Sequence, residues 1–592
     1  MMKTSRGLVC PFVDTFFRYD HVKNRLFMYD FYIEGRHLSS LVKLGRFFMT
    51  ILIARNIEKS FGDRTIFTLP SLEIQANDRI GIVGVNGAGK STLLQILSKE
   101  IEADKGTVTH HSSIAIIPQL SEGIPETASS LAKGKWNISN VANSMSGGER
   151  MRLKIAHALE QDAGILFADE PTSHLDMFGT EQLEKALLSY KGALVLISHD
   201  RDLLDAICTK IVEVEDGTIQ EYKGNYSNYR KQKERERIQK EAEYDQYIQE
   251  KNRLEQSISQ RKQRASSMTK IPTRFSSSES KLYKCSGAHG QENVSKVAKA
   301  LETRLGKLEQ KEKPKDFSQA QFDVQYHTPI HSKAVVQFNK TTKKIGNRTL
   351  FKNMNGTIVP GAKLAILGEN GSGKTTLFKM LLANERGIQL SKSCKIGYFE
   401  QTLSILKTDK TILENVLEET NYTESFVRTI LARLLFRRED VHKPVHILSG
   451  GERMKVALAK VFLGNYNMLL LDEPTNYLDL ATQEELESML QEYPGTILFI
   501  SHDRAFIRSV ANHILQVDEG EPRIFHGNYE QYTKRTTQAS VNVTEQELLR
   551  LQTKLTEIIS RISIPNQHDD ITFLEQEYEK LLVRIRQCKE AL

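Results

Sequence analysis

The chain carries the stretch GVNGAGKS at residues 84–91 and a second version of it, GENGSGKT, at residues 368–375. Glycines at this spacing let backbone N–H groups approach phosphate oxygens, while the lysine reaches the β and γ phosphates and the last hydroxyl binds Mg²⁺. Each stretch follows a short apolar run, at residues 79–83 and 363–367, and precedes a helical pattern, as a phosphate-binding loop requires. Two copies argue against a chance glycine-rich turn and predict a tandem ATPase with an α/β fold.

The residues of the two loops expected to bind ATP are Gly84, Asn86, Gly87, Ala88, Gly89, Lys90, Ser91 and Thr92 in the first half, and Gly368, Asn370, Gly371, Ser372, Gly373, Lys374, Thr375 and Thr376 in the second.

The same ordered motifs follow each loop. A glutamine ends a strand-like run, SGGE stands at residues 146–149 and 449–452, an Asp-Glu pair ends an apolar run, and Ser-His-Asp stands at residues 198–200 and 501–503. An acidic pair beside a phosphate loop favours metal binding and water activation over a structural role. This order resembles the ATP-binding cassette ATPases over residues 50–225 and 333–530.

That resemblance implies a role for each motif. Glu170 and Glu473 would polarise the attacking water, and His199 and His502 would contact the γ-phosphate. The Mg²⁺ ligands would be Ser91, Gln119 and Asp169 in one site and Thr375, Gln401 and Asp472 in the other, with both glutamines also serving catalysis. Ser146, Gly147 and Gly148 would close on the nucleotide of the second half, and Ser449, Gly450 and Gly451 on that of the first. The chain would then act as a monomer with two head-to-tail sites, closed by ATP and released by hydrolysis.

The position expected to stack on adenine differs between the halves. Phe61 precedes the loop lysine by the same distance as Ile345, since 90 − 61 = 374 − 345 = 29. Stacking on an aromatic ring contributes about 1–3 kcal/mol per base, so the two sites are predicted to be unequal. The sequence leaves open whether both ATP molecules are hydrolysed.

Composition narrows the class of protein. The 592 residues suggest about four domains by length alone, which the repeats reduce to two cassettes and their connections. No apolar run reaches the 18 or so residues of a membrane span. Five cysteines without paired spacing argue against disulfides and metal clusters, including an iron–sulfur cassette protein, and suit a cytoplasmic location.

The interval between the glutamine and the SGGE motif is 27 positions in the first half and 48 in the second. Transporters build in this interval the helical subdomain that receives a membrane partner. The first half is therefore predicted to lack that subdomain, which disfavours a symmetric transporter and leaves an asymmetric one open.

A basic segment joins the two halves. Residues 230–315 hold 22 Lys and Arg against 12 Asp and Glu, whereas the whole chain has a net charge of +7. Apolar residues at helical spacing within 244–258 and 294–308 predict an antiparallel helical hairpin, each helix roughly 30–40 Å long. Its expected tip, residues 261–290, has seven basic residues, one acid and two interleaved aromatics, which favours contact with nucleic acid over a solvated linker.

This architecture resembles the ABC-F family, and the GNYSNY stretch at 224–229, the short first cassette and LETRL at 301–305 resemble its Vga-type antibiotic-resistance members. The resemblance implies a partner, the 70S ribosome, bound at its E site in the ATP form with the hairpin pointing toward the peptidyl-transferase centre. A lincosamide, pleuromutilin or streptogramin A would be displaced, directly or through rRNA and the P-site tRNA. The tip residues expected to contact the ribosome are Lys270, Arg274, Phe275, Lys281, Tyr283 and Lys284. Two alternatives remain: a general ribosome-rescue translation factor and the ATPase subunit of a drug exporter.

The predicted domains are an N-terminal extension (1–48), the first cassette (49–228), the linker hairpin (229–318), the second cassette (319–537) and a C-terminal helical hairpin (538–592). Met49 is a candidate start, and disorder is expected before it. The last hairpin is expected at 544–562 and 571–592, where it either contacts the ribosome or packs on a cassette.

Overall fold

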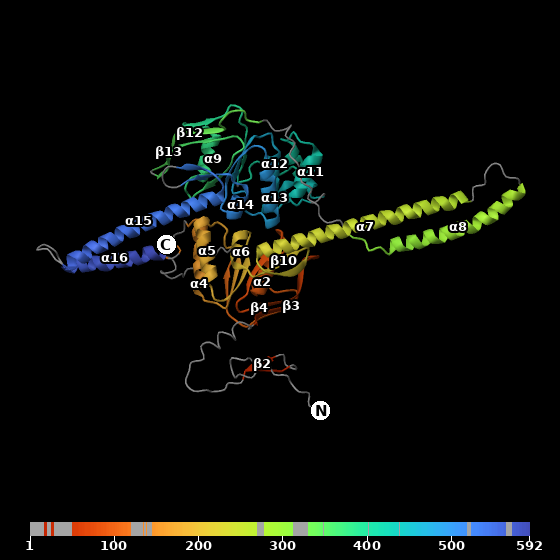
Figure 1. Cartoon of the computed structure of the whole chain (residues 1–592), viewed down its shortest axis with the longest axis horizontal. Coiled ribbons are helices and arrows are strands. Elements are labelled where there is room, and N and C mark those ends of the chain that lie inside the picture. The colour runs from red at the N-terminus through yellow and green to blue at the C-terminus, as the bar shows by residue number, and fades with distance from the viewer. Residues whose placement is uncertain are drawn as a thin grey trace.

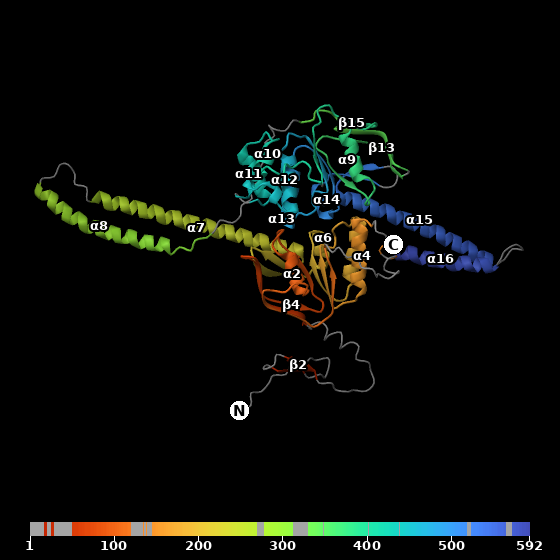
Figure 2. The ribbon, with the colours of Figure 1, turned by 180° about the vertical axis from the view of Figure 1, so that it is seen from behind.

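The computed structural model of the chain describes residues 17–20, 25–28, 50–119, 134, 136, 138, 145–268, 277–311, 329–346, 348–400, 402–436, 439–517, 522–563 and 571–591. Within its long helices, the side chains at 268–291, at most positions of 537–549, at 563–575 and beyond 586 are not described. Two α/β cassettes stack on each other, and two helical hairpins project from them in opposite directions (Figures 1 and 2).

The first cassette is built on one nine-stranded sheet with the order β6-β3-β4-β11-β10-β5-β9-β8-β7. The strands β5, β7, β8, β9 and β10 are parallel, and β5, β8 and β9 are almost entirely buried, as expected for strands covered on both faces. The strands are β3 (Thr50–Phe61), β4 (Arg64–Gln75), β5 (Arg79–Val83), β6 (Lys105–His110), β7 (Ile114–Ile117), β8 (Ile165–Asp169), β9 (Ala193–Ile197), β10 (Lys210–Glu215) and β11 (Thr218–Lys223). The helices are α2 (Lys90–Leu97), α4 (Gly147–Glu160), α5 (Met177–Ser189) and α6 (Arg201–Ile207).

The second cassette repeats this plan in two sheets, β16-β17-β18-β14-β19-β20 and β13-β12-β15. Its strands are β12 (Val336–Ile345), β13 (Arg348–Ile358), β14 (Lys363–Leu367), β15 (Ile388–Leu390), β16 (Ile396–Phe399), β17 (Met468–Asp472), β18 (Thr496–Ile500), β19 (His513–Gln516) and β20 (Arg523–His526). Its helices are α9 (Lys374–Leu382), α10 (Ile412–Leu417), α11 (Glu424–Arg433), α12 (Gly450–Leu463), α13 (Leu480–Glu492) and α14 (Arg504–Val510), with the 3-10 turns η2 (Asp440–His442) and η3 (Val445–Ile447). The predicted fold class, two cassettes joined by a helical hairpin with a helical C-terminal extension, is confirmed.

The helical subdomain of the second cassette consists of α10, α11, η2 and η3 and lies between Gln401 and Ser449. The matching interval of the first cassette falls mostly outside the described residues. The predicted loss of this subdomain from the first cassette therefore stays a prediction.

The linker hairpin consists of α7 (Tyr226–Met268) and α8 (Ser277–Gly306), which lie side by side (Figures 1 and 2). At 1.5 Å per residue these helices are about 64 and 45 Å long, so the prediction of 30–40 Å was wrong. The prediction rested on apolar positions from 244 onward and left out the earlier turns of α7, where Tyr226 and Tyr229 are buried and the next turns carry ion pairs such as Arg237–Glu241. The seam between the helices buries Leu254, Ile258 and Ala298.

The C-terminal hairpin consists of α15 (Tyr529–Ser563) and α16 (Ile571–Ala591). The first of these helices begins at Tyr529 rather than at the predicted Thr544, because the buried Tyr529 ring anchors its first turn beside α14, and tertiary packing overrides a run of poor helix formers.

Near the N-terminus, β1 (Phe17–Asp20) and β2 (Arg25–Met28) pair antiparallel, and the remaining residues before Thr50 lie outside the description. The predicted domain boundaries and the prediction for residues 1–48 stay predictions. Among the described residues, no helix is both long and apolar enough to cross a membrane.

Candidate nucleotide sites

Each phosphate-binding loop connects a buried strand, β5 or β14, to the N-terminus of a helix, α2 or α9. The last glycine before the lysine has a left-handed backbone, with φ of 98° at Gly89 and 102° at Gly373. A Cβ at Gly89 would lie 2.6 Å from Ile66 Cγ2, so both conformation and space require glycine there. The free N–H groups of the helix start are left to bind an anion.

The loop lysines lie across their own loops. Lys90 Nζ donates to the carbonyl oxygens of Gly84 (2.9 Å) and Val85 (3.2 Å). Lys374 Nζ donates to those of Gly368 (2.8 Å) and Glu369 (3.0 Å). Burial lowers the pKa of both ammonium groups, although neighbouring carboxylates oppose the shift. Both lysines are therefore held at the position where phosphate would enter.

The residues expected to hold Mg²⁺ meet in pairs. Asp169 and Asp472, at the ends of β8 and β17, accept hydrogen bonds from the hydroxyls of Ser91 and Thr375. Burial raises the pKa of both carboxyls, although those hydrogen bonds oppose the shift. Asp169 Oδ1 is buried and has no hydrogen-bond partner among the residues that the structure describes, which leaves an oxygen for a cation.

This donor set suits Mg²⁺. Mg²⁺ is usually bound by one or two protein oxygens together with phosphates and water, rather than by a cage of side chains. Within the described part of the chain, no group of three or more His, Cys, Asp or Glu side chains could hold a metal ion.

Glu170 lies among three polar side chains. Its Oε2 accepts hydrogen bonds from Gln119 Nε2 (2.7 Å) and Ser173 Oγ (3.4 Å), and its Oε1 lies 3.1 Å from His199 Nε2. Burial alone would raise the pKa of this carboxyl, but the adjacent His199 and the nearby Lys90 charge bring the pKa below its usual value. The carboxyl is thus ionised and able to accept a proton or hydrogen bond from water.

Glu473 occupies the same place in the second cassette, with its Oε1 at 3.3 Å from His502 Nε2. Here burial dominates and raises the pKa of the carboxyl to about 7, although the Lys374 charge opposes the shift. Burial and the Lys374 charge lower the pKa of His502 to about 4. Both glutamates have left-handed backbones, with φ of 47° and 51°, a conformation that costs energy and marks functional positions. Gln401 lies outside the described residues.

The SGGE motifs form the N-termini of α4 and α12, where Ser146 and Ser449 each cap the helix in a capping box with the following glutamate. A cavity of about 440 Å³ between the cassettes is lined by Ser146, Gly147 and Gly148 together with Asn370 and Gly371. In the other half, a Cβ on Gly451 would lie 3.5 Å from Asn86 Nδ2. Each SGGE motif therefore faces the phosphate loop of the other cassette.

The loop asparagines also bind across the interface. Asn86 Nδ2 donates to the Tyr477 carbonyl oxygen (2.7 Å), and Asn86 N donates to Asp479 Oδ2 (3.1 Å). Asn370 Nδ2 donates to the His174 carbonyl oxygen (3.3 Å). The structure thus holds the cassettes head to tail.

The two positions predicted to stack on adenine are both exposed on the surface, Phe61 by 57% and Ile345 by 56%. Ile345 lines a cavity of about 460 Å³ with Lys374, Thr375 and Thr376. In the first cassette, Lys59 Nζ lies 5.6 Å from the centroid of the Phe61 ring. Thr92 lies half-buried in the first turn of α2.

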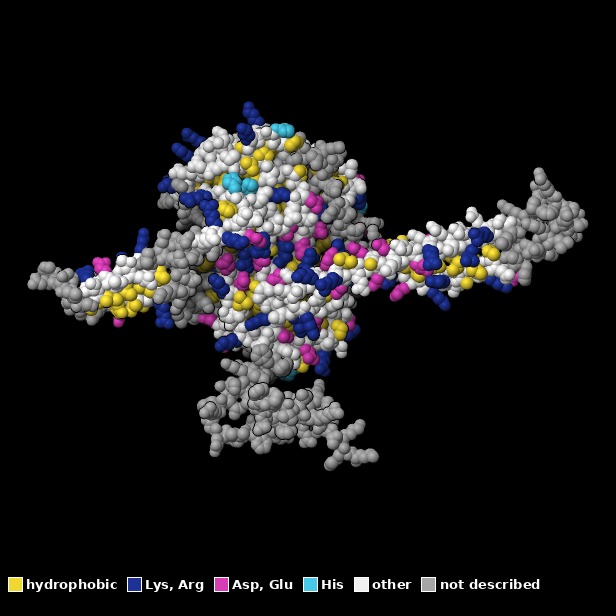
Figure 3. All heavy atoms as spheres, viewed as in Figure 1, with side chains coloured by type: hydrophobic (Ala, Val, Ile, Leu, Met, Phe, Trp, Pro, Cys, Tyr) yellow, Lys and Arg dark blue, Asp and Glu magenta, His cyan; other side chains and the backbone are white. Residues whose placement is uncertain are grey.

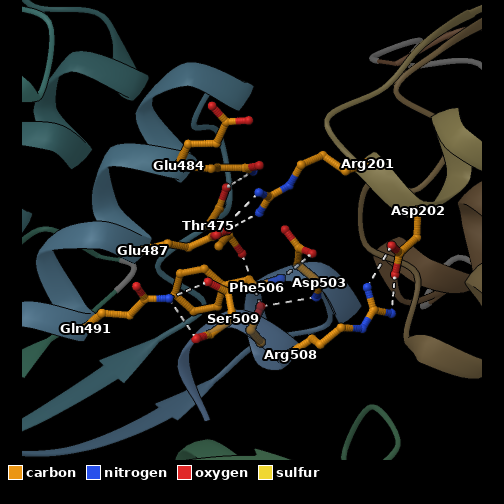
Figure 4. Close-up of polar contacts among 12 residues, drawn as sticks. Arg201, Asp202, Thr475, Glu484, Glu487, Gln491, Asp503, Phe506, Arg508 and Ser509 are labelled. Atoms are coloured by element: carbon orange, nitrogen blue, oxygen red, sulfur yellow. Dashed lines mark hydrogen bonds and ion pairs between the residues drawn. The ribbon is translucent and has the colours of Figure 1, made fainter. Parts of the chain in front are cut away.

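Ion pairs join the cassettes, and Figure 4 shows those of Arg201 with Glu487 and of Asp202 with Arg508. Arg201 pairs with Glu487, and Arg504 Nη2 lies 2.7 Å from Glu184 Oε2. The members correspond by a constant spacing, since 504 − 201 = 487 − 184 = 303. Asp202 adds a pair with Arg508 (3.1 Å). No motif in the sequence predicted these residues, although the stretch GNYSNY at 224–229 recurs as GNYEQY at 527–532 with the same spacing.

The candidate ribosome contacts fall at the linker tip. Lys270, Arg274 and Phe275 lie outside the described residues, and Lys281, Tyr283 and Lys284 lie on α8, where only the backbone is described. Lys and Arg side chains are spread along the described part of the hairpin (Figure 3).

Comparisons with known proteins agree with this geometry. The family model described as ABC transporter matches residues 68–129, 123–173 and 351–476. The ribosome protection protein VmlR of Bacillus subtilis is 32% identical over 550 residues, which cover 91% of this chain and 98% of that protein. The erythromycin resistance ATP-binding protein MsrA of Staphylococcus epidermidis is 34% identical over 452 residues, 74% of this chain and 91% of that protein.

Among solved structures, an archaeal ribosome recycling factor in complex with a ribosomal stalk protein matches with a TM-score of 0.55 and 19% identity, over 82% of this chain and 92% of that chain. At this identity the likeness concerns the fold alone. Fold and paired sites together define the chain as a tandem ATP-binding cassette ATPase, which hydrolyses ATP. Within that class, it belongs to the ABC-F family.

Proposed function

We propose that this protein binds the ribosome in its ATP-bound form and protects it from antibiotics that act at the peptidyl-transferase centre. Two relatives bear names of this kind, a ribosome protection protein and an erythromycin resistance protein. The observation that carries the proposal is the linker hairpin: α7 leaves the cassette pair as one continuous helix of 43 residues. A rigid, basic rod of about 64 Å at 1.5 Å per residue can reach a distant site that the cassettes themselves cannot enter.

In this proposal the two sites at the cassette interface bind ATP with Mg²⁺. The loop N–H groups and Lys90 or Lys374 bind the phosphates, and Asp169 with Ser91, or Asp472 with Thr375, holds the metal, which neutralises developing charge when bound. Glu170 and Glu473 orient water, His199 and His502 contact the γ-phosphate, and the SGGE serine and glycines of the opposite cassette complete each site. Gln119 and Gln401 support the metal and the water.

ATP therefore joins surfaces from both cassettes, and its hydrolysis weakens their contact. We propose that the closed form binds the E site of the 70S ribosome in the cytoplasm and that hydrolysis releases it. The linker tip, with Lys270, Arg274, Phe275, Lys281, Tyr283 and Lys284, then acts on rRNA and the P-site tRNA and displaces a lincosamide, pleuromutilin or streptogramin A. Basic and aromatic side chains suit phosphate neutralisation and base stacking.

A co-sedimentation experiment tests ribosome binding. The Glu170→Gln, Glu473→Gln double variant keeps the phosphate-binding residues but cannot activate water, so ATP should trap the closed form. We expect it to pellet with 70S ribosomes in ATP and to stay in the supernatant in ADP. Recovery with membranes, or no difference between the nucleotides, would contradict the proposal; binding without protection from any drug would indicate a general translation factor.

A further inference from the structure

A buried carboxylate, Glu213, helps to anchor the base of the linker hairpin to its own cassette, together with Asp205, which accepts a hydrogen bond from Ser227 N (2.6 Å). Glu213 on β10 is 6% exposed and accepts hydrogen bonds from Tyr229 OH (2.6 Å) and Lys233 Nζ (2.6 Å). Lys233 also pairs with Glu215 (2.6 Å). Tyr229 and Lys233 lie one turn apart on α7, so this network fixes the first turns of the helix to the first cassette.

The same turns of α7 also contact the second cassette through Glu484 on α13. Tyr226 OH donates to Glu484 Oε1 (3.1 Å), and Arg230 Nη2 lies 2.7 Å from Glu484 Oε2. Tyr226 is only 5% exposed, so its hydroxyl is committed to this contact. The two donors are four residues apart, so the Glu484 carboxylate contacts both ends of one turn of α7. These contacts restrain the rotation and the tilt of the helix.

Glu484 lies within the interface that closure forms. The next turn of α13 carries Glu487, which binds Arg201, and Arg201 and Glu484 face each other closely enough to interact (Figure 4). Opening of the cassettes would therefore carry Glu484 away from α7 together with the rest of α13. The anchor at Glu213 would remain, because it lies within the first cassette.

The base of the C-terminal hairpin corresponds by sequence to the base of the linker hairpin, so the two can be compared within one chain. Glu181 and Tyr529 correspond to Glu484 and Tyr226 at the spacing of 303 residues (484 − 181 = 529 − 226 = 303). Thr533 stands where α7 has Arg230, and Gln516 stands where β10 has Glu213. The carboxylate of Glu484 is thus repeated as Glu181, whereas the charges of Arg230 and Glu213 are not repeated at α15.

We propose that Glu484 is a positioning residue that couples closure of the cassettes to the direction of the linker hairpin. With the cassettes closed, α7 is held from both sides; with the cassettes open, it is held only by the first cassette and pivots. The direction of the hairpin is then fixed only while ATP is bound. This inference deepens the proposed function, but its test needs no ribosome.

The test measures two distances by spin labelling at exposed positions, with labels introduced as unnatural amino acids. Gln260 on α7 with Glu73 on β4 reports the direction of the hairpin, and Glu73 with Lys352 on β13 reports closure. In the Glu170→Gln, Glu473→Gln background, we expect ATP to narrow the first distance distribution and to shorten the second distance. In Glu484→Ala, ATP should still shorten the distance that reports closure but should no longer narrow the distribution that reports the direction of the hairpin. Because hydrogen bonds to a charged group are lost, the population of molecules in which α7 contacts α13 should fall by on the order of tenfold.

Two further variants separate positioning from general damage. Glu484→Gln keeps an oxygen that can accept from Tyr226 and Arg230, so it should retain the narrow distribution better than Glu484→Ala, and Glu181→Gln should leave the distribution unchanged. The proposal is overturned if Glu484→Ala keeps the narrow distribution, or if Glu484→Ala and Glu484→Gln both abolish closure. Failure of ribosome binding with normal distance changes would contradict the proposed function and leave this coupling supported.

Discussion

The two composite nucleotide sites contain the same kinds of residue but hold them differently. In the first, Gln119, Ser173 and His199 surround Glu170 and the pKa of its carboxyl is low, whereas burial raises the pKa of Glu473 to about 7. Phe61 in the first site and Ile345 in the second stand at the position predicted to stack on adenine. Duplicated sites within one chain can thus diverge without losing any loop residue, and we expect the first site to bind and hydrolyse ATP more readily at neutral pH.

The largest effect is expected from removing the two glutamates, one at a time and together. The double variant Glu170→Gln, Glu473→Gln should lose at least about 10²-fold of the ATPase activity, the usual contribution of a general base. Steady-state phosphate release measures the activity, and equilibrium ATP binding serves as the control for folding. A double variant with more than a tenth of the original activity would rule out both glutamates as bases.

The single variants should differ in their pH dependence. Glu170→Gln leaves only the site of Glu473, whose carboxyl must lose its proton to accept one from water, so hydrolysis should rise from about pH 6 to about pH 8. Glu473→Gln leaves the site of Glu170, whose lowered pKa keeps it ionised throughout this range, so its profile should be flat. Phosphate release by each single variant gives the two profiles. Parallel profiles would remove the distinction between the sites.

The ion pairs across the interface should also be unequal. Glu487 is 7% exposed and its partner Arg201 is mostly buried, so Glu487→Gln should weaken ATP-dependent closure by about 1.5–3 kcal/mol, as for a lost bond to a charged group. Glu184→Gln should weaken closure by less than Glu487→Gln does, because Glu184 is more exposed. In addition, Arg504 would still have Asp202 as a partner, at 3.9 Å. The ATP concentration for half-maximal closure measures both. Equal effects of the two variants would indicate that both ion pairs contribute the same free energy to closure.

Exchanging the adenine-side residues should reverse the difference in affinity. Phe61→Ile should weaken ATP binding in the first site by about 1–2 kcal/mol, and Ile345→Phe should strengthen binding in the second by a similar amount, because a ring stacks on the base. Titration with ATP, and with an inosine analogue as a check of base selectivity, measures both. If neither exchange alters affinity, these positions do not contact the base.

The smallest effect is expected at the rim of the interface. Asp202 and Arg508 form a partly exposed pair, with side chains 24% and 44% accessible. Asp202→Asn should therefore change closure by less than about 1 kcal/mol, and added salt should shrink the effect further. A loss as large as that of Glu487→Gln would show that exposure does not govern these pairs.

Local patterns in the sequence predicted the fold and the loops well. The strands expected at 79–83 and 363–367 are β5 and β14 with those bounds, because short apolar runs before glycine-rich loops encode their own structure. The first turns of α7 and α15 were missed because a few tyrosines, Tyr226 and Tyr229 in one and Tyr529 in the other, pack on the cassettes among polar neighbours and form no long apolar stripe. Glu484 and the interface pairs could not be predicted, because they depend on how two distant parts of the chain meet. The raised pKa of Glu473 follows from burial, which no local pattern records.

The most direct test of the central claim is displacement of a drug from the ribosome. Ribosomes with a P-site tRNA and radiolabelled lincosamide would be mixed with the Glu170→Gln, Glu473→Gln variant in ATP, with the same variant carrying Phe275→Ala and Tyr283→Ala as the control. The account predicts release of the drug by the first protein and retention with the second, although both bind the ribosome. Stable binding of the first protein with the drug still in place, tested across lincosamide, pleuromutilin and streptogramin A, would contradict it.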